Sequence, residues 1–208
     1  MAAWCAIRTF PKHAQEMSGE TPPEPVFFLK PDAAIIGGNN PISEINCMDG
    51  EIHHEVEMVI QLDENQKPYA IAIGLDLTLR DIQAELKESG LPWARAKSFS
   101  NSAVIGNWLE LADKLSLLEI GFDEYVAELH ISLSLDGKQV QSANISEMSY
   151  SPSQQLEKLV QWAPMCTNDT LFTGTPSGVG PLFKGQKLVA MLQHSNGELL
   201  SIIDAVCI

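Results

Sequence analysis

The stretch from His53 to Ile60 constrains the fold of this chain most, because its two faces differ in chemistry when it is read as a strand. A period of two puts Glu55 and Glu57 on one face and the apolar residues between and after them on the other. Neighbouring carboxylates on one strand face repel each other unless something positive lies between them. The alternative is a solvated strand face at the edge of a sheet, which is the commoner outcome for an isolated pair of glutamates.

The surroundings of these two carboxylates favour a buried site. The segment from Tyr69 to Leu79 is apolar enough to form a second core strand, and Asp76 lies near its end. Buried carboxylates must share a proton, meet cationic side chains or bind a metal. Three of them suit a hard cation such as Mg²⁺, which keeps water or substrate oxygens as further ligands. We therefore predict a metal site at Glu55, Glu57 and Asp76.

Length and charge limit the classes of protein to which the chain can belong. A chain of 208 residues can bury a sizeable core, so we predict one domain over residues 1–208. The formal net charge of −14 argues against nucleic acid and, more weakly, against an anionic membrane surface. A divalent cation can reverse the field locally, so a small anionic substrate remains compatible with this charge. The four scattered cysteines indicate reduced thiols, and the lack of a leader-like or membrane-length apolar run predicts a cytoplasmic location.

Most of the regular structure is predicted to be β. A short apolar strand is expected over residues 26–30, stopped by Pro31. Clean alternation from Leu129 to Leu135, followed by Asp136-Gly137, predicts a hairpin. A second hairpin is predicted over residues 187–206.

The helical signals are fewer. Helical spacing begins after Thr78, the expected N-cap, and ends near Gly90. A second amphipathic helix is predicted over residues 152–163, and residues 91–99 are expected to form a loop. We therefore expect an α+β fold, mostly β with two or three helices.

Several polar side chains can reach the predicted acidic centre. Arg80 and Gln83 are three apart on the predicted helix and share the face close to Asp76. Lys97 brings a basic residue towards the same place, although a surface lysine is the commoner outcome. His13 and Glu16 can pair on one helical turn, which would leave the second ring nitrogen free as a base; an exposed pair is the alternative.

The glycine-rich run from Thr173 to Pro181 is not a nucleotide-binding phosphate loop. It lacks the Gly-Lys-Ser/Thr ending, does not open a helix and is interrupted by proline. Its glycines instead allow sharp turns or a close approach of the backbone to a ligand. The hydroxyls of Thr173 and Thr175 can be offered to a carboxylate.

Four separated stretches together resemble the fumarylacetoacetate hydrolase superfamily, in its small acylpyruvase and oxaloacetate decarboxylase type; they are residues 53–60, 74–83, 91–99 and 173–181. The resemblance runs from about His13 to the C-terminal hairpin. It implies a rolled mixed β-sandwich with a helix layer, a mobile N-terminal lid over about residues 9–25, and a homodimer. The chain departs from the family pattern at Thr9, where asparagine is usual, and at Pro11, which precedes the lid histidine.

The resemblance also assigns roles to the candidate residues. It implies Mg²⁺, with Mn²⁺ or Ca²⁺ as substitutes, at the three carboxylates. The implied partner is a small 2-oxo acid, which Arg80, Gln83 and Thr175 would bind while Lys97 lies near the reacting carbon. His13 and Glu16 match the catalytic dyad of the family, carried on the lid.

The implied reaction is hydrolysis of the C–C bond of a 2,4-dioxo acid (an acylpyruvate) through a metal-bound enolate. Two enzymatic alternatives use the same electron sink: oxaloacetate decarboxylation, and isomerisation of the 2-hydroxyhepta-2,4-diene-1,7-dioate type. A metal-stabilised binding protein without activity is a further alternative, because the lid departs from the family pattern.

Overall fold

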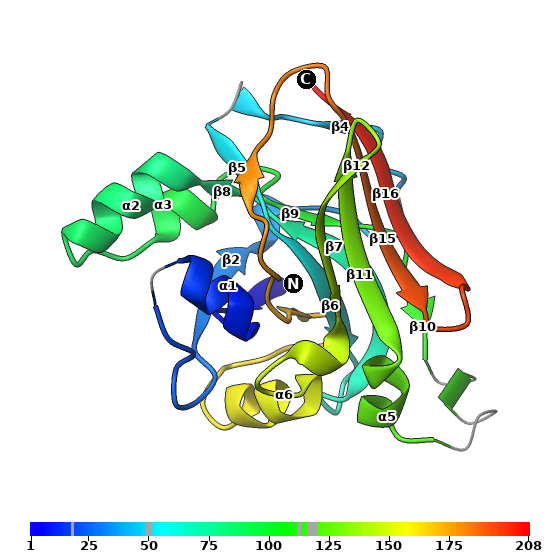
Figure 1. Ribbon diagram of the computed structural model, residues 1–208. Coiled ribbons are helices and arrows are strands. Elements are labelled where there is room, and N and C mark those ends of the chain that lie inside the picture. The colour runs from blue at the N-terminus through cyan, green and yellow to red at the C-terminus, as the bar shows by residue number, and fades with distance from the viewer. Residues whose placement is uncertain (18, 49–50, 112–113, 116–119) are drawn as a thin grey trace.

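The strands of the protein form three sheets that curl into a roll (Figure 1). The computed structural model describes residues 1–208 apart from 18, 49–50, 112–113 and 116–119. In the largest sheet the order is β2-β1-β13-β6-β7-β9-β3, with β10 beside β7. Its strands are β1 Ala2–Ala6, β2 Phe27–Pro31, β3 Ile35–Gly37, β6 Val56–Leu62, β7 Pro68–Asp76, β9 Ala103–Ile105, β10 Leu109–Glu110 and β13 Thr170–Phe172.

The two smaller sheets complete the roll. The order of the five-stranded sheet is β12-β11-β15-β16-β4, and that of the three-stranded sheet is β14-β5-β8. The strands of the former are β4 Glu44–Ile45, β11 Leu129–Leu135, β12 Lys138–Asn144, β15 Lys187–His194 and β16 Leu199–Cys207. Those of the latter are β5 Ile52–His54, β8 Thr78–Leu79 and β14 Gly180–Pro181. Parallel pairs such as β1–β13 occur beside antiparallel ones, which makes the sheets mixed.

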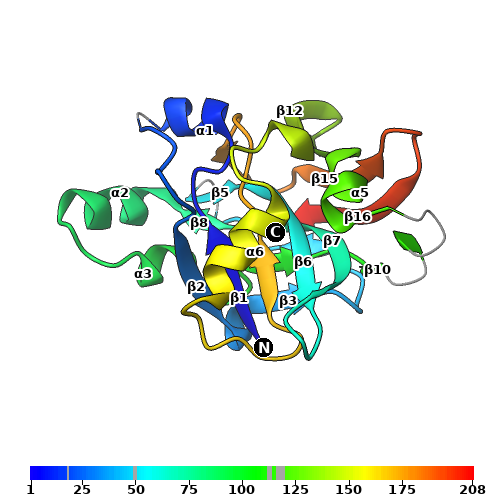
Figure 2. The same ribbon diagram turned by 90° about the horizontal axis from the view of Figure 1, so that it is seen from below.

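Helices lie around the roll rather than inside it (Figure 1). The described helices are α1 Pro11–Glu16, α2 Arg80–Glu88, α3 Ala94–Lys97, α5 Phe122–Ala127 and α6 Pro152–Val160, with 3₁₀ turns η1 Asp32–Ala34 and η3 Ile145–Glu147. α6 lies below the sheets and is seen in front of them in Figure 2. Just after this helix, Trp162 packs edge-on against Trp4 of β1, with ring centroids 5.5 Å apart. None of the helices in the described part of the chain has the length and apolarity needed to cross a membrane.

The alternation predicted for the central strand is confirmed. Met58 and Ile60 of β6 belong to the main core cluster, which also contains Ile131 and Leu133 of the five-stranded sheet. Val59 points the other way, into a smaller apolar cluster on the far face of the large sheet. Both faces of β6 are therefore buried, and the face that carries the carboxylates is packed rather than solvated.

Both predicted core strands are interrupted at one seam. β5 ends at His54 and β6 begins at Val56, so Glu55 lies between two sheets. β7 likewise ends at Asp76, and β8 follows in the three-stranded sheet. The Asp76 amide donates to the Glu55 carbonyl (2.9 Å). This hydrogen bond joins the two points at which the chain passes from one sheet to another. Polar side chains can lie close together here because the regular hydrogen bonding between strands stops at this seam.

The structure confirms some of the other predicted elements and corrects others. Both hairpins and the helix that starts at Pro152 are confirmed, and the fold is α+β as expected. Thr78 is not the N-cap of α2: Leu79 holds that position, and the Thr78 hydroxyl donates to the Asp76 carbonyl. The loop predicted over residues 91–99 contains the helical turn α3. The predicted count of two or three helices is therefore too low for the described residues, because one-turn helices leave little periodicity in a sequence.

Candidate active site

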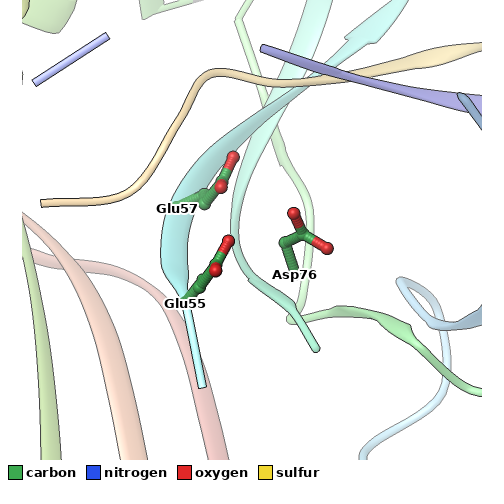
Figure 3. Close-up of side chains that lie close together, drawn as sticks. All are labelled: Glu55, Glu57 and Asp76. Carbon is green, nitrogen blue, oxygen red and sulfur yellow. The ribbon is translucent and has the colours of Figure 1, made fainter. Parts of the chain in front are cut away.

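The three predicted metal-ligating carboxylates converge at the seam between the sheets (Figure 3). Glu55, Glu57 and Asp76 each offer an oxygen, and these oxygens lie within 4.8 Å of one another. All three side chains are buried, with 6%, 1% and 1% exposure respectively. These three side chains therefore do not lie on a solvated sheet edge.

Cationic side chains neutralise two of the three carboxylates. Lys97 Nζ lies 2.8 Å from Glu55 Oε2 and 2.6 Å from Asp76 Oδ2, and Arg80 pairs with the other Glu55 oxygen. Burial alone would raise the pKa of Glu55, but the charges of Lys97 and Arg80 hold it well below its usual range. Burial alone would lower the pKa of Lys97, and Asp76 and Glu55 outweigh that effect and raise it. Lys97 is thus a buried cation and not a surface lysine.

Glu57 is the carboxylate without a cationic side chain bound to it in the described structure. One of its oxygens accepts a hydrogen bond from the Gly174 amide (2.7 Å). Burial, followed by the charges of Asp76 and Glu55, raises the pKa of Glu57 well above its usual value. Three buried hard oxygen donors, one of them without a cationic partner among the described residues, fit a divalent cation such as Mg²⁺ or Mn²⁺.

The predicted dyad is formed on α1. His13 Nδ1 lies 3.0 Å from Glu16 Oε2, and the Gly178 amide donates to Glu16 Oε1 (3.0 Å). His13 is buried and lines the same cavity as the three carboxylates. Because Nδ1 is held by the carboxylate, Nε2 is the ring nitrogen available for proton transfer.

The residues predicted to bind the substrate line this cavity as well. Arg80 and Gln83 share a face of α2, as expected, and Arg80 Nη1 donates to Gln83 Oε1 (2.7 Å). Thr175 enters from the glycine-rich run, and its hydroxyl accepts a hydrogen bond from Gln141 Nε2 (2.9 Å). Of the nine predicted site residues, Glu16 alone does not line the cavity; it lies behind His13. Their catalytic and binding roles stay predictions.

Thr9, a departure from the family pattern, has a clear structural place. Its hydroxyl donates to the Thr173 carbonyl (2.8 Å), and its own carbonyl accepts from the Ser149 amide (2.8 Å). Gly174 has a positive φ of 102°, and a Cβ there would lie 2.0 Å from the Thr9 hydroxyl oxygen. Thr9 thus connects the segment that bears α1 to the glycine-rich run.

Sequence reasoning missed three residues. Lys30 is fully buried, with Nζ 2.7 Å from Asp76 Oδ1 and hydrogen bonds to the Leu77 and Ser102 carbonyls. Gln141 holds both His54 and Thr175. Arg8 lines the cavity. Nothing in the local sequence distinguishes these residues from surface ones, because each reaches the site through a contact between distant segments.

Comparisons with known proteins agree with the fold and the site. The family model described as "Fumarylacetoacetate (FAA) hydrolase C-terminal" matches residues 2–200. The oxaloacetate tautomerase YcgM of Escherichia coli (strain K12) is 33% identical over 194 residues, which cover 88% of this chain and 84% of the relative. A mitochondrial oxaloacetate decarboxylase of Dictyostelium discoideum is 30% identical over 190 residues, 86% of this chain and 83% of the relative.

A solved structure adds a ligand-bound relative. Fumarylpyruvate hydrolase from Pseudomonas aeruginosa, in complex with Mn²⁺ and pyruvate, superposes with a TM-score of 0.82 at 25% identity. The match covers all of this chain and 90% of that one. With the family model spanning nearly every residue and the acidic centre in place, the chain belongs to the fumarylacetoacetate hydrolase family.

Proposed function

We propose that this protein is a divalent-metal-dependent enzyme that acts on a small 2-oxo acid. One observation carries the proposal: the buried carboxylates Glu55, Glu57 and Asp76 line the same cavity as His13 of the His13–Glu16 dyad. Ligands for a hard cation and a base for proton transfer are thus placed around one small space. The relatives named above are enzymes of oxo acids, which supports the same class.

The metal we propose is Mg²⁺, with Mn²⁺ or Ca²⁺ as substitutes, held by the three carboxylates. The Mn²⁺ bound by the fumarylpyruvate hydrolase supports a cation of this kind. A divalent cation there would polarise the keto and carboxylate oxygens of the substrate and so make loss of a proton or a carbon group at C3 easier. Lys97 and Lys30 hold Glu55 and Asp76 in a fixed geometry around it.

The protein's own residues would bind and orient the acid. Arg80 and Gln83 would present adjacent donors from α2, and Thr175 would present a hydroxyl from the glycine-rich run. Gln141 fixes the Thr175 side chain, which limits the positions the substrate carboxylate can take. Residues of about 9–25 would serve as a lid; in support, His13 of α1 lines the cavity and Glu16 of α1 is bound to the Gly178 amide.

The first candidate reaction is hydrolysis of a 2,4-dioxo acid. His13, oriented by Glu16, would take a proton from water as the oxygen adds to the C4 carbonyl. The C3–C4 bond then breaks, which releases a carboxylic acid and the enolate of pyruvate. Protonation of that enolate at C3, by His13 or Lys97, would give pyruvate.

The second candidate is enol–keto conversion or decarboxylation of oxaloacetate. It is favoured by the curated relatives, whose names include oxaloacetate tautomerase and oxaloacetate decarboxylase. Tautomerisation would move one proton between the enol oxygen and C3, and decarboxylation would replace the departing CO₂ at C3 with a proton. Neither reaction needs an activated water.

A small substrate panel tests the proposal. Pyruvate release from acetylpyruvate, fumarylpyruvate and oxaloacetate, and the ultraviolet change of enol-oxaloacetate, would be followed with Mg²⁺ and with EDTA. We expect turnover of at least one acid that EDTA abolishes. If none of these acids is turned over in a metal-dependent way, the proposal is wrong and the non-catalytic alternative remains.

The His13→Gln variant separates hydrolysis from decarboxylation. General-base catalysis contributes about 10²–10⁴-fold, so hydrolysis should fall by that factor. Decarboxylation of oxaloacetate should persist, because it requires no deprotonated water. The matched control is Lys12→Gln, which changes the exposed neighbour on the same helix and should leave both rates unchanged.

A further inference from the structure

Gln141 does not line the cavity, but its side chain is bound to two of the segments around it. It extends from β12 in the five-stranded sheet to the glycine-rich run on one side and to the junction of β5 and β6 on the other. A Cβ at Gly178 would come within 2.1 Å of the Val140 carbonyl oxygen, so the run packs directly against β12. With 1% exposure, the Gln141 amide must find its hydrogen-bond partners inside the protein.

Two backbone groups determine which way the Gln141 amide is turned. The Val56 nitrogen, which can only donate, lies 3.1 Å from one arm of the amide, and the Pro176 carbonyl oxygen, which can only accept, lies 2.8 Å from the other. Oε1 must therefore face Val56, and Nε2 must face Pro176. The reverse orientation is excluded, because it would place donor against donor at one arm and acceptor against acceptor at the other.

The orientation of this amide in turn determines the polarity of the Thr175 hydroxyl. Gln141 Nε2 lies 2.9 Å from Thr175 Oγ1, and an amide nitrogen can only donate, so the hydroxyl oxygen accepts this hydrogen bond. The hydroxyl hydrogen has no acceptor among the residues that the structure describes. Thr175 is 4% exposed and lines the cavity, so this hydrogen is available to a ligand there. The accepted hydrogen bond also polarises the O–H group and makes it a better donor.

Two other uncharged side chains show what is particular to Thr175. The Thr173 hydroxyl of the same run donates to the Met58 carbonyl (2.8 Å), so its hydrogen is already used within the protein. On α2, Gln83 Oε1 accepts from Arg80 Nη1 (2.7 Å), which leaves the NH₂ group of Gln83 as a donor at the cavity wall. Gln83 and Thr175 therefore both offer hydrogens to the cavity, as the binding of an anion requires.

We propose that Gln141 is a positioning residue that makes Thr175 a hydrogen-bond donor to the bound acid. Its amide is fixed by the backbone of two segments, and it turns the Thr175 hydroxyl so that the hydrogen meets a negatively charged oxygen of the ligand. The inference rests on the proposed function and adds to it a residue that does not touch the substrate. It holds for either candidate reaction, because both begin with an anionic acid bound in the cavity.

The hydrogen on the His54 ring reports the orientation of the Gln141 amide in the unchanged protein. His54 Nδ1 lies 2.8 Å from Gln141 Oε1, so Nδ1 must carry a hydrogen. Nitrogen-15 NMR of the full chain, labelled at histidine, distinguishes a protonated from an unprotonated Nδ1. We expect a protonated Nδ1. An unprotonated Nδ1 would mean that the amide nitrogen faces His54, and it would overturn the proposal.

A double-mutant cycle tests the consequence for binding. The ligand is oxalate, a stable anion with the shape of the pyruvate enolate, and its dissociation constant would be measured by calorimetry on each full chain saturated with Mg²⁺. Thr175→Val removes the hydroxyl and should weaken binding about tenfold, the loss expected for one hydrogen bond to a charged oxygen. Thr175→Ser keeps the hydroxyl and should bind oxalate within about threefold of the wild type.

The Gln141 variants complete the cycle. Gln141→Met removes the donor to Thr175 without adding charge and should weaken oxalate binding about three- to tenfold. In the Thr175→Val background the same change should have less than about a twofold effect, because no hydroxyl is left to orient. Gln141→Glu should weaken binding more, since its carboxylate would accept the Thr175 hydrogen, and most of that loss should also disappear with Thr175→Val. The matched control is Gln139→Met, at an exposed position of β12 that does not line the cavity.

The possible failures are distinguishable. Additive losses in the cycle, which a purely structural disturbance would give, would overturn the positioning role and leave the proposed function standing. Equal oxalate binding by Thr175→Val and the wild type would do the same. Absence of any Mg²⁺-dependent oxalate binding by the wild type would overturn the proposed function and this inference together. If Gln141→Met does not fold, the His54 spectrum and the two Thr175 variants can still overturn the proposal.

Discussion

At the scale of single residues, the acidic centre depends on lysines buried on either side of it. Lys97 contacts one oxygen of Asp76, and Lys30 contacts the other. Burial lowers the pKa of Lys30, and the charge of Asp76 offsets that effect only in part. Lys30 also satisfies two buried carbonyls, those of Leu77 and Ser102. It is therefore a structural counter-ion that does not line the cavity.

Replacing Lys30 should be costly. The Lys30→Met variant keeps the length of the side chain but leaves Asp76 and two carbonyls short of a partner. Removing one member of a buried pair costs about 3–5 kcal/mol, so the free energy of unfolding in urea, measured without metal, should fall by that amount. Lys67→Met, at an exposed lysine, should change it by less than about 0.5 kcal/mol. A Lys30→Met protein within about 1 kcal/mol of the wild type would contradict this account.

At the scale of elements, α1 is too short to be stable alone and is held by its neighbours. The six-residue helix has no side-chain N-cap, and its ends are tied by Thr9 to Thr173 and by Glu16 to Gly178. A third contact follows the helix, where the Tyr150 hydroxyl donates to the Pro22 carbonyl. The position of His13 is therefore decided by tertiary contacts and not by helix propensity.

Loss of the Thr9 hydroxyl should loosen this helix. Thr9→Val preserves shape and leaves the Thr173 carbonyl without its donor, at a cost of about 1–1.5 kcal/mol. Hydrogen exchange of the Ala14 and Met17 amides, which close α1, should become about tenfold faster. Thr9→Ser retains the donor and should restore most of the protection. Equal exchange in Thr9→Val and wild type would show that the hydroxyl does not hold α1.

At the scale of the whole molecule, metal binding should be linked to stability and pH. The pKa of Glu57 is raised in the folded, metal-free protein, so folding binds a proton, and this contribution to stability is lost as pH rises above the usual glutamate range. A cation at the three carboxylates must displace that proton. The gain in Tm caused by Mg²⁺ should therefore increase between about pH 5 and pH 8.

Two comparisons check the pH prediction. Glu55 does not interfere, because its pKa is lowered and its contribution is constant above the usual range. Glu57→Gln should bind Mg²⁺ weakly and show a small gain in Tm that does not vary with pH. A gain that falls as the pH rises in the wild type would have the wrong sign for this mechanism.

The assembly can be tested at the same scale. The family resemblance predicts a homodimer, so size-exclusion chromatography with light scattering should give twice the chain mass of 22.8 kDa. A mass of one chain across the micromolar range would contradict the prediction.

The sequence by itself determined what depends on local periodicity. The alternation around Met58 determines the face that carries Glu57 in β6 and Glu55 just before it, and Asp136-Gly137 determines a hairpin, because side-chain direction and turn geometry are set by neighbouring residues. Local pattern and family resemblance identify the nine candidate residues, but they do not give the contacts that these residues make.

Only the tertiary structure decided what joins distant segments. Lys30 of β2 reaches Asp76 of β7 although three strands lie between them in the sheet order. Gln141 reaches Thr175 from the five-stranded sheet, and the residues on either side of Arg8 are bound to Val26, Thr173 and Ser149. No periodicity encodes such pairings, since strand order is set by burial and hydrogen bonding over the entire chain. The same reason explains why the charges around the cavity were invisible in the sequence: a net charge of −14 says nothing about where the few cations gather.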